Sequence, residues 1–94
     1  MECSIHGRVQ GVMFRDFARR TATKLGLVGE VVNKRDGGVR LVAEGEESVL
    51  HELLASLRIG PTFARVDTVD VVWGDAQGVY SDFKIVYRNF LDRL

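Results

Sequence analysis

Residues 7–15 have the sequence Gly-Arg-Val-Gln-Gly-Val-Met-Phe-Arg. This stretch joins a short strand-like segment, residues 2–6, to an amphipathic helical pattern that begins near Arg15. Its two glycines, Gly7 and Gly11, allow a tight turn with positive φ angles. A strand, a glycine-containing loop and a helix N-terminus direct several backbone N–H groups into one concavity, where the helix dipole also favours negative charge. The Arg15 guanidinium can hold two phosphate oxygens at once, so the stretch predicts a site for one phosphate or carboxylate group.

The rest of the chain alternates between strand and helix patterns. Apolar residues recur at helical spacing from Phe14 to Leu25 and again from Val49 to Leu57, and a glycine follows each run. We therefore expect helices at residues 15–25 and around residues 49–57, and strands at residues 2–8, 27–33, 39–44, 66–73 and 83–87. Residues 34–38 contain the glycines of a tight hairpin turn, and residues 88–94 form a tail that is either helical or frayed.

This order of elements predicts the fold. It is strand-helix-strand-strand-helix-strand, with an additional short strand at the end. Right-handed crossovers place both helices on one face of an antiparallel sheet. We expect an α+β protein with a ferredoxin-like α/β sandwich, βαββαβ, and a single domain that spans residues 1–94.

The composition fits a small enzyme domain and excludes several other classes. The chain has 94 residues, 46% of them apolar, which is enough for one core. Thirteen basic and thirteen acidic residues balance, which argues against a nucleic-acid partner. Cys3 is the single cysteine, which favours a reducing, cytoplasmic location. The sequence contains neither a run of about 20 apolar residues nor a signal peptide, so we expect no membrane partner.

Several kinds of catalytic chemistry find no support in the sequence. His6 and His51 are isolated, and no His, Asp or Glu cluster has the spacing of metal ligands, so we expect no metal. Cys3 lies outside the predicted loop, whereas a cysteine-based phosphatase carries its nucleophile within it. No Ser-His-Asp arrangement is evident either.

The sequence resembles that of the acylphosphatases in three places. Residues 7–15 are similar to the first signature of this family at all nine positions. Residues 26–39 resemble the second signature, in which Asn33 falls on the catalytic asparagine. Glu30 departs from that motif, because the family usually has an aromatic residue there, and a charge would remove an apolar contact. Residues 60–66 give a third, weaker match, so the resemblance extends from about Ile5 to Tyr87.

The resemblance implies metal-independent hydrolysis of the carboxyl-phosphate anhydride of acyl phosphates, without a cofactor. Arg15 and the loop would hold the phosphoryl group, and Asn33 would orient the attacking water. A phosphate oxygen of the substrate would take the water's proton. Acyl phosphates suit such a site, because the carboxylate leaves without protonation by the enzyme. We expect a monomer whose partners are a small acyl phosphate and inorganic phosphate, as product or inhibitor. The loop residues implied in phosphate binding are Val9, Gln10, Gly11, Val12, Met13 and Phe14.

Alternatives to this interpretation remain. The foremost is a non-catalytic ferredoxin-like module that binds phosphate or another small anion. RNA-recognition modules share the element order, but residues 39–44 carry no aromatic side chain and end in an acid. A regulatory small-molecule module usually accompanies a catalytic domain. A related domain also begins the hydrogenase-maturation carbamoyltransferases, whose remaining domains this sequence lacks.

Overall fold

The computed structural model describes residues 1–93, so Leu94, the last residue of the predicted tail, lies outside the described part. Each predicted strand and helix is present, with small shifts at the ends. A short 3₁₀ helix in the tail is the one further element. The elements are β1 (Glu2–Arg8), α1 (Phe14–Lys24), β2 (Val28–Asn33), β3 (Val39–Glu44), α2 (Glu47–Ile59), β4 (Arg65–Val72), β5 (Phe83–Val86) and η1 (Phe90–Arg93).

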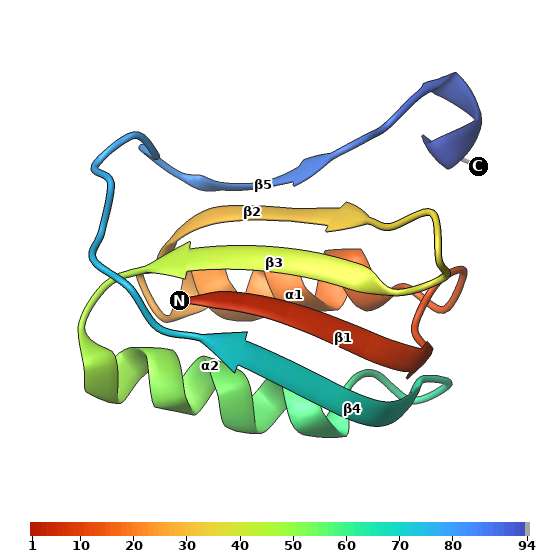
Figure 1. Ribbon diagram of the computed structural model, residues 1–94, viewed down its shortest axis with the longest axis horizontal. Helices are drawn as coiled ribbons and strands as arrows, with labels where there is room; N and C mark the ends of the chain where they lie inside the picture. The colour runs from red at the N-terminus through yellow and green to blue at the C-terminus, as the bar shows by residue number, and fades with distance from the viewer. Residues whose placement is uncertain (94) are drawn as a thin grey trace.

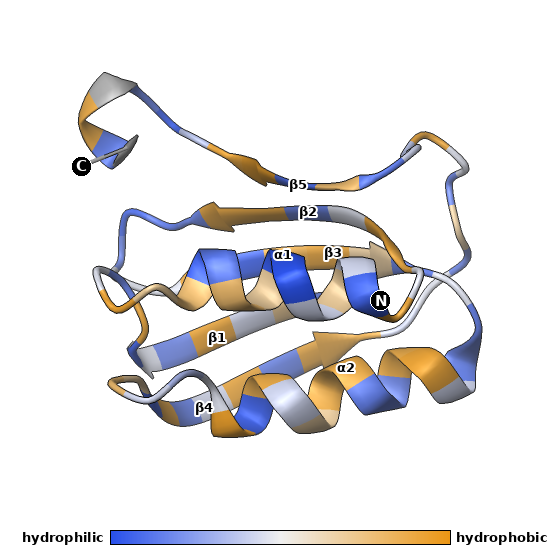
Figure 2. Ribbon diagram, turned by 180° about the vertical axis from the view of Figure 1, so that it is seen from behind, coloured by the Kyte–Doolittle hydropathy of each residue, from blue (hydrophilic) through white to orange (hydrophobic). Residues whose placement is uncertain are grey.

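The strands form one sheet in the order β4-β1-β3-β2-β5. The neighbours among β1 to β4 pair antiparallel, as expected, whereas β5 pairs with the edge of β2 in parallel. The sheet is therefore mixed. Both helices cover the same face of it, which is the near face in Figure 2. This is the predicted α+β sandwich.

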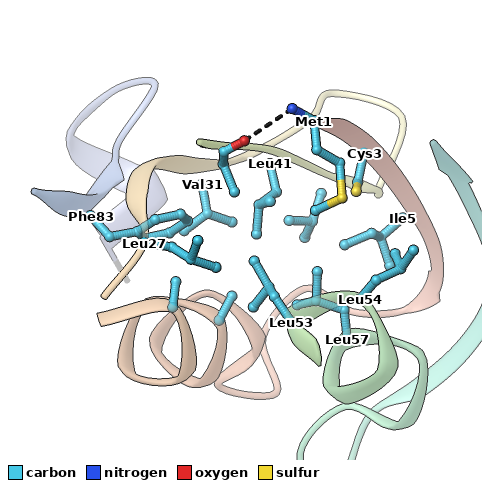
Figure 3. Packing of buried hydrophobic residues seen from close by; sticks show 14 of the residues in the cluster. Met1, Cys3, Ile5, Leu27, Val31, Leu41, Leu53, Leu54, Leu57 and Phe83 are labelled. Atoms are coloured by element: carbon cyan, nitrogen blue, oxygen red, sulfur yellow. Dashed lines mark hydrogen bonds between the residues drawn. The ribbon is translucent and has the colours of Figure 1, made fainter. Parts of the chain in front are cut away.

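The core fills the space between the sheet and the two helices (Figure 3). Inward-facing strand residues meet the apolar stripes of α1 and α2, where Ala18, Ala22 and Leu53 are completely buried. The amino group of Met1 donates a hydrogen bond to the carbonyl of Ala43 at 3.0 Å, which ties the start of the chain to β3. Among the described residues, neither helix has the length and apolar character needed to cross a bilayer. The buried strand residues include Cys3, Ile5, Val31, Val39, Leu41, Ala43 and Phe83.

Glu30 is accommodated on the sheet face that lies away from the helices. On β2 its neighbours Gly29 and Val31 are buried, whereas Glu30 is only partly covered. The hydroxyl of Tyr80, from the segment between β4 and β5, donates a hydrogen bond to the Glu30 carboxylate at 2.8 Å. This bond raises the pKa of Tyr80 above its ordinary value. A polar contact to the crossing segment therefore exists where the family's aromatic residue would give an apolar one.

We expect Leu53→Ala to lower the free energy of unfolding by about 2–5 kcal/mol, because it leaves a cavity in a close-packed core. Leu53 is fully buried, whereas Ile59, on the same helix, is 78% exposed. Urea denaturation measures the effect, with Ile59→Ala as the matched control. Equal losses for the two variants would contradict the described core.

Candidate active site

A pocket of about 790 Å³ lies at the end of the sheet where β1, β2 and β5 terminate. Figure 1 shows these three ends together, with the β1–α1 loop, the β2–β3 turn and η1 around them. Arg15 and Asn33 both line this pocket, although they are far apart in the sequence. The structure therefore brings the two predicted site residues together.

The β1–α1 loop is anchored at both ends and bends sharply between them. Val9 and Phe14 are almost fully buried, so their side chains hold the loop ends in the core. Between them, Gly11 has φ of 74° and Met13 has φ of 65°. A left-handed conformation is common for glycine but unusual for methionine. Left-handed residues of this kind are a feature of the turns in which neighbouring N–H groups can be directed to one side.

Met13 is the N-cap of α1, and its side chain provides no capping hydrogen bond. The first N–H groups of a helix have no intrahelical acceptor and carry the positive end of the dipole. Within the described residues, the backbone N–H groups of Gln10 to Met13 donate no hydrogen bond to another backbone group of the loops and turns. The loop and the first helical turn thus supply several N–H donors beside Arg15.

Gln10 connects the loop to the β2–β3 turn through its side chain. Its Nε2 atom donates hydrogen bonds to the carbonyl oxygens of Lys34, at 2.7 Å, and of Gly38, at 2.8 Å. Asn33 immediately precedes this turn. The Gln10 bridge therefore fixes the position of Asn33 relative to the loop.

The turn itself is braced by Asp36. The carboxylate accepts a hydrogen bond from the backbone N–H of Gly38 at 2.9 Å and lies 3.2 Å from Nε2 of His6. The Gly38 N–H, followed by His6, lowers the pKa of Asp36 to about 2. His6 thus has a partner in the turn, on the side of β1 that leads into the loop.

Asn33 and Arg15 both donate hydrogen bonds to Asp92, in η1. The Asn33 amide Nδ2 lies 3.0 Å from Oδ1 of Asp92, and Nη1 of Arg15 lies 3.1 Å from Oδ2. Nη2 of Arg15 donates to the main-chain carbonyl of Asp92 at 2.9 Å. The Arg15 guanidinium also lies over the Tyr87 ring, 5.1 Å from its centroid. The pocket therefore already contains one carboxylate, held by the two predicted site residues.

Asp16, the acid closest to Arg15 in the sequence, is paired with other bases. Arg19 and Arg20 hold its carboxylate at 2.9 and 2.8 Å, and the hydrogen bond from Arg19 is the largest cause of its lowered pKa. These ion pairs reduce the repulsion that a negative charge in the first helical turn would exert on a bound anion. Among the described residues, no three His, Cys, Asp or Glu side chains form a group that could hold a metal ion.

Comparisons with known proteins agree with this geometry. The acylphosphatase family model matches residues 1–85. The chain belongs to the acylphosphatase family.

The relatives cover most of the chain. A Salinibacter ruber acylphosphatase is 49% identical over 81 residues, which span 86% of this chain and 85% of that protein. An acylphosphatase of Methanococcoides burtonii is 45% identical over 84 residues, spanning 89% and 88%. The crystal structure of the Bacillus subtilis acylphosphatase superposes with a TM-score of 0.88 at 36% identity and covers 92% of this chain and 96% of its own. The expected family, fold and enzyme class are confirmed.

The loop residues that the sequence predicts for phosphate binding lie in different surroundings. Gln10, Gly11 and Met13 line the pocket, as do Val9 and Phe14 at the loop ends. Val12 does not line the pocket and instead packs against the core. The Gln10 side chain donates both of its hydrogen bonds to the β2–β3 turn.

Sequence reasoning missed the contribution of the tail to the pocket. Tyr87, Arg88, Asn89 and Asp92 all line it. The available signal was Asn89, because an Asn side chain commonly caps a turn a few residues later. Here its Oδ1 accepts a hydrogen bond from the Asp92 N–H at 3.1 Å, which shapes the 3₁₀ turn.

We expect Gln10→Ala to lower the free energy of unfolding by about 1–3 kcal/mol, because two partly buried hydrogen bonds are lost and each carbonyl keeps only its backbone donor. Chemical denaturation measures this loss, and Gln77→Ala, at an exposed position, is the control. Amide hydrogen exchange should also quicken at residues 34–38. Unchanged exchange in this turn would show that Gln10 does not couple it to the loop.

Proposed function

We propose that the chain hydrolyses the carboxyl-phosphate anhydride bond of small acyl phosphates and releases a carboxylate and inorganic phosphate. The observation that carries this proposal is the joint contact of Arg15 and Asn33 with one carboxylate in the pocket. A carboxylate presents two negatively charged oxygens, as does one edge of a phosphoryl group. Membership of the acylphosphatase family supports the reaction, and the contact supports the site.

Arg15 and the loop N–H groups would bind the phosphoryl oxygens. The Arg15 side chain is 19% exposed, so its charge acts in a partly desolvated position. Phosphoryl transfer passes through a loose transition state with charge on the equatorial oxygens, where fixed donors give most of the stabilisation. The breaking P–O bond leaves its electrons on the carboxylate, a weak base that needs no proton from the protein.

Asn33 would hold the attacking water. Its Nδ2 can donate a hydrogen bond to the water oxygen. Its Oδ1, which is buried and has no partner within the described residues, can accept a hydrogen bond from the water. The water oxygen bonds to phosphorus on the side opposite the leaving carboxylate. Its proton passes to a phosphoryl oxygen, so that the reaction balances as acyl phosphate and water giving carboxylate and phosphate. No base on the protein is required.

The direct test follows the hydrolysis of benzoyl phosphate by ultraviolet absorbance in the presence of a chelator. The wild type should be active, because the proposed steps use no metal. Asn33→Ala should lower kcat on the order of 10²–10³-fold, the usual loss for one donor to the reacting atoms. Inorganic phosphate should inhibit both proteins with similar constants. A folded wild type that binds phosphate without hydrolysis would favour the anion-binding module instead.

Arg15→Ala should affect both binding and turnover, because the guanidinium contacts the phosphoryl group in the ground state and in the transition state. We expect kcat/KM to fall by a factor on the order of 10³ and inhibition by phosphate to weaken. Arg35→Ala, which removes an exposed arginine from the β2–β3 turn, is the matched control. Loss of kcat with unaltered phosphate inhibition would argue against phosphate binding by Arg15.

A further inference from the structure

The tail holds a carboxylate against Arg15 and Asn33, the two residues to which the proposed function assigns the substrate and its attacking water. Oδ2 of Asp92 accepts hydrogen bonds from Arg15, at 3.1 Å, and from the backbone N–H of Arg88, at 3.0 Å. Oδ1 accepts from Asn33 at 3.0 Å. Only 3% of the Asp92 side chain is exposed, so its carboxylate is covered by the groups that hold it at the wall of the pocket.

The charge state of the Asp92 carboxyl group is also that of an anion. Burial raises the pKa of Asp92. The hydrogen bonds from the Arg88 N–H and the Asn33 amide, together with the charges of Arg15 and Arg88, lower it by more than burial raises it. The pKa of Asp92 therefore lies below its ordinary value. Asp92 is therefore ionised near neutral pH. Among the described side chains, the charged groups that face it are Arg15 and, 3.9 Å away, the Arg88 guanidinium.

Asp92 engages donor groups that both site residues would otherwise offer to a substrate and its attacking water. Both terminal nitrogens of Arg15 are directed at this one residue, and the donor atom of the Asn33 amide is directed at its carboxylate. We propose that the Asp92 segment is an intramolecular competitor, which occupies the phosphoryl site in the resting protein and is displaced by an anionic substrate. The identity of the displacing substrate in this inference rests on the proposed function, whereas the competition with inorganic phosphate does not.

The tail is attached in a way that permits displacement. The pairing of β5 with β2 ends at Val86, so the hydrogen-bonded ladder of the sheet does not extend to Asp92. Leu91, in η1, is 70% exposed. The contacts of Asp92 itself are polar, and the proposed substrate can replace them, the phosphoryl group at Arg15 and the attacking water at Asn33.

Competition of this kind raises the apparent KM without affecting turnover. When the competent state is only a fraction of the molecules, the apparent dissociation constant is the intrinsic one divided by that fraction. If about one molecule in ten is open, removal of the carboxylate should improve apparent affinity roughly tenfold. Once substrate has displaced the tail, Arg15 and Asn33 are in the same state in both proteins, so kcat should remain the same.

The test compares wild type, Asp92→Ala, Asp92→Asn and, as a control that removes one exposed acid, Asp75→Ala. KM and kcat are measured with benzoyl phosphate, and the Kd of inorganic phosphate by calorimetry. Asp92→Ala should lower KM and the phosphate Kd by a similar factor, on the order of tenfold, at constant kcat. Asp92→Asn, which keeps the shape and loses the charge, should shift both in the same direction, and Asp75→Ala should shift neither.

Other outcomes overturn the inference. A fall in kcat for Asp92→Ala would show that Asp92 positions Arg15 and Asn33 for the reaction. Active wild type with unaltered KM and phosphate Kd in Asp92→Ala would also refute the competitor while the proposed function stands. Conversely, tighter phosphate binding by Asp92→Ala without hydrolysis by any protein would support the competitor and refute the proposed function.

Hydrogen exchange gives a second measurement that does not depend on turnover. The Arg88 N–H donates to the Asp92 carboxylate, so displacement of Asp92 removes its acceptor. Saturating inorganic phosphate should therefore quicken exchange of the Arg88 amide in the wild type. Unchanged or slower exchange at this amide would mean that phosphate binds without moving the tail, which contradicts the proposal.

Discussion

The antiparallel pairing of β3 with both β1 and β2 is the constraint on which the site depends. Because both neighbours run opposite to β3, they run in the same direction and end at the same edge of the sheet. β5 pairs in parallel with β2 and therefore ends there too, as the arrows in Figure 1 show. This one edge receives the loop from β1, Asn33 from β2 and the tail from β5. Groups that are distant in the sequence meet because the strands that carry them end on the same side of the sheet.

The sequence allowed the local parts of this arrangement to be predicted, because each depends on neighbouring residues. The glycine loop, the amphipathic helices and the position of Asn33 before a glycine turn all have short-range signals. The contacts between these parts had no such signal. The Gln10 side chain bonds to carbonyls 24 and 28 residues away, and Tyr80 lies 50 residues from Glu30. The tail has too few apolar residues to show a period, and Asp92 finds its partners only after the sheet has formed.

The electrostatics of the site also follow from local pairing rather than from net charge. The chain carries a formal net charge of zero, yet the pocket holds an anion. Acids near the site are each matched by a base, Asp16 by Arg19 and Arg20, and Asp36 by His6. Because Asp16 is paired with Arg19 and Arg20, the Arg15 guanidinium is directed at Asp92 in the pocket instead. A guanidinium and a buried amide that face a partly desolvated space are costly unless something satisfies them.

A tethered carboxylate is a simple way to satisfy such donors, since a group on the same chain acts at a high effective concentration. It leaves one atom unsatisfied, however. Oδ1 of Asn33 is buried and can only accept a hydrogen bond, and an ionised carboxylate has no proton to donate to it. Asp92 therefore satisfies the donors of the candidate site, whereas this acceptor has no partner among the described residues. A water molecule can donate a hydrogen bond to this oxygen, whereas an ionised group cannot. A site that holds a phosphoryl group beside a water needs such an acceptor for the water. The unmatched oxygen of Asn33 thus argues for hydrolysis over simple anion binding.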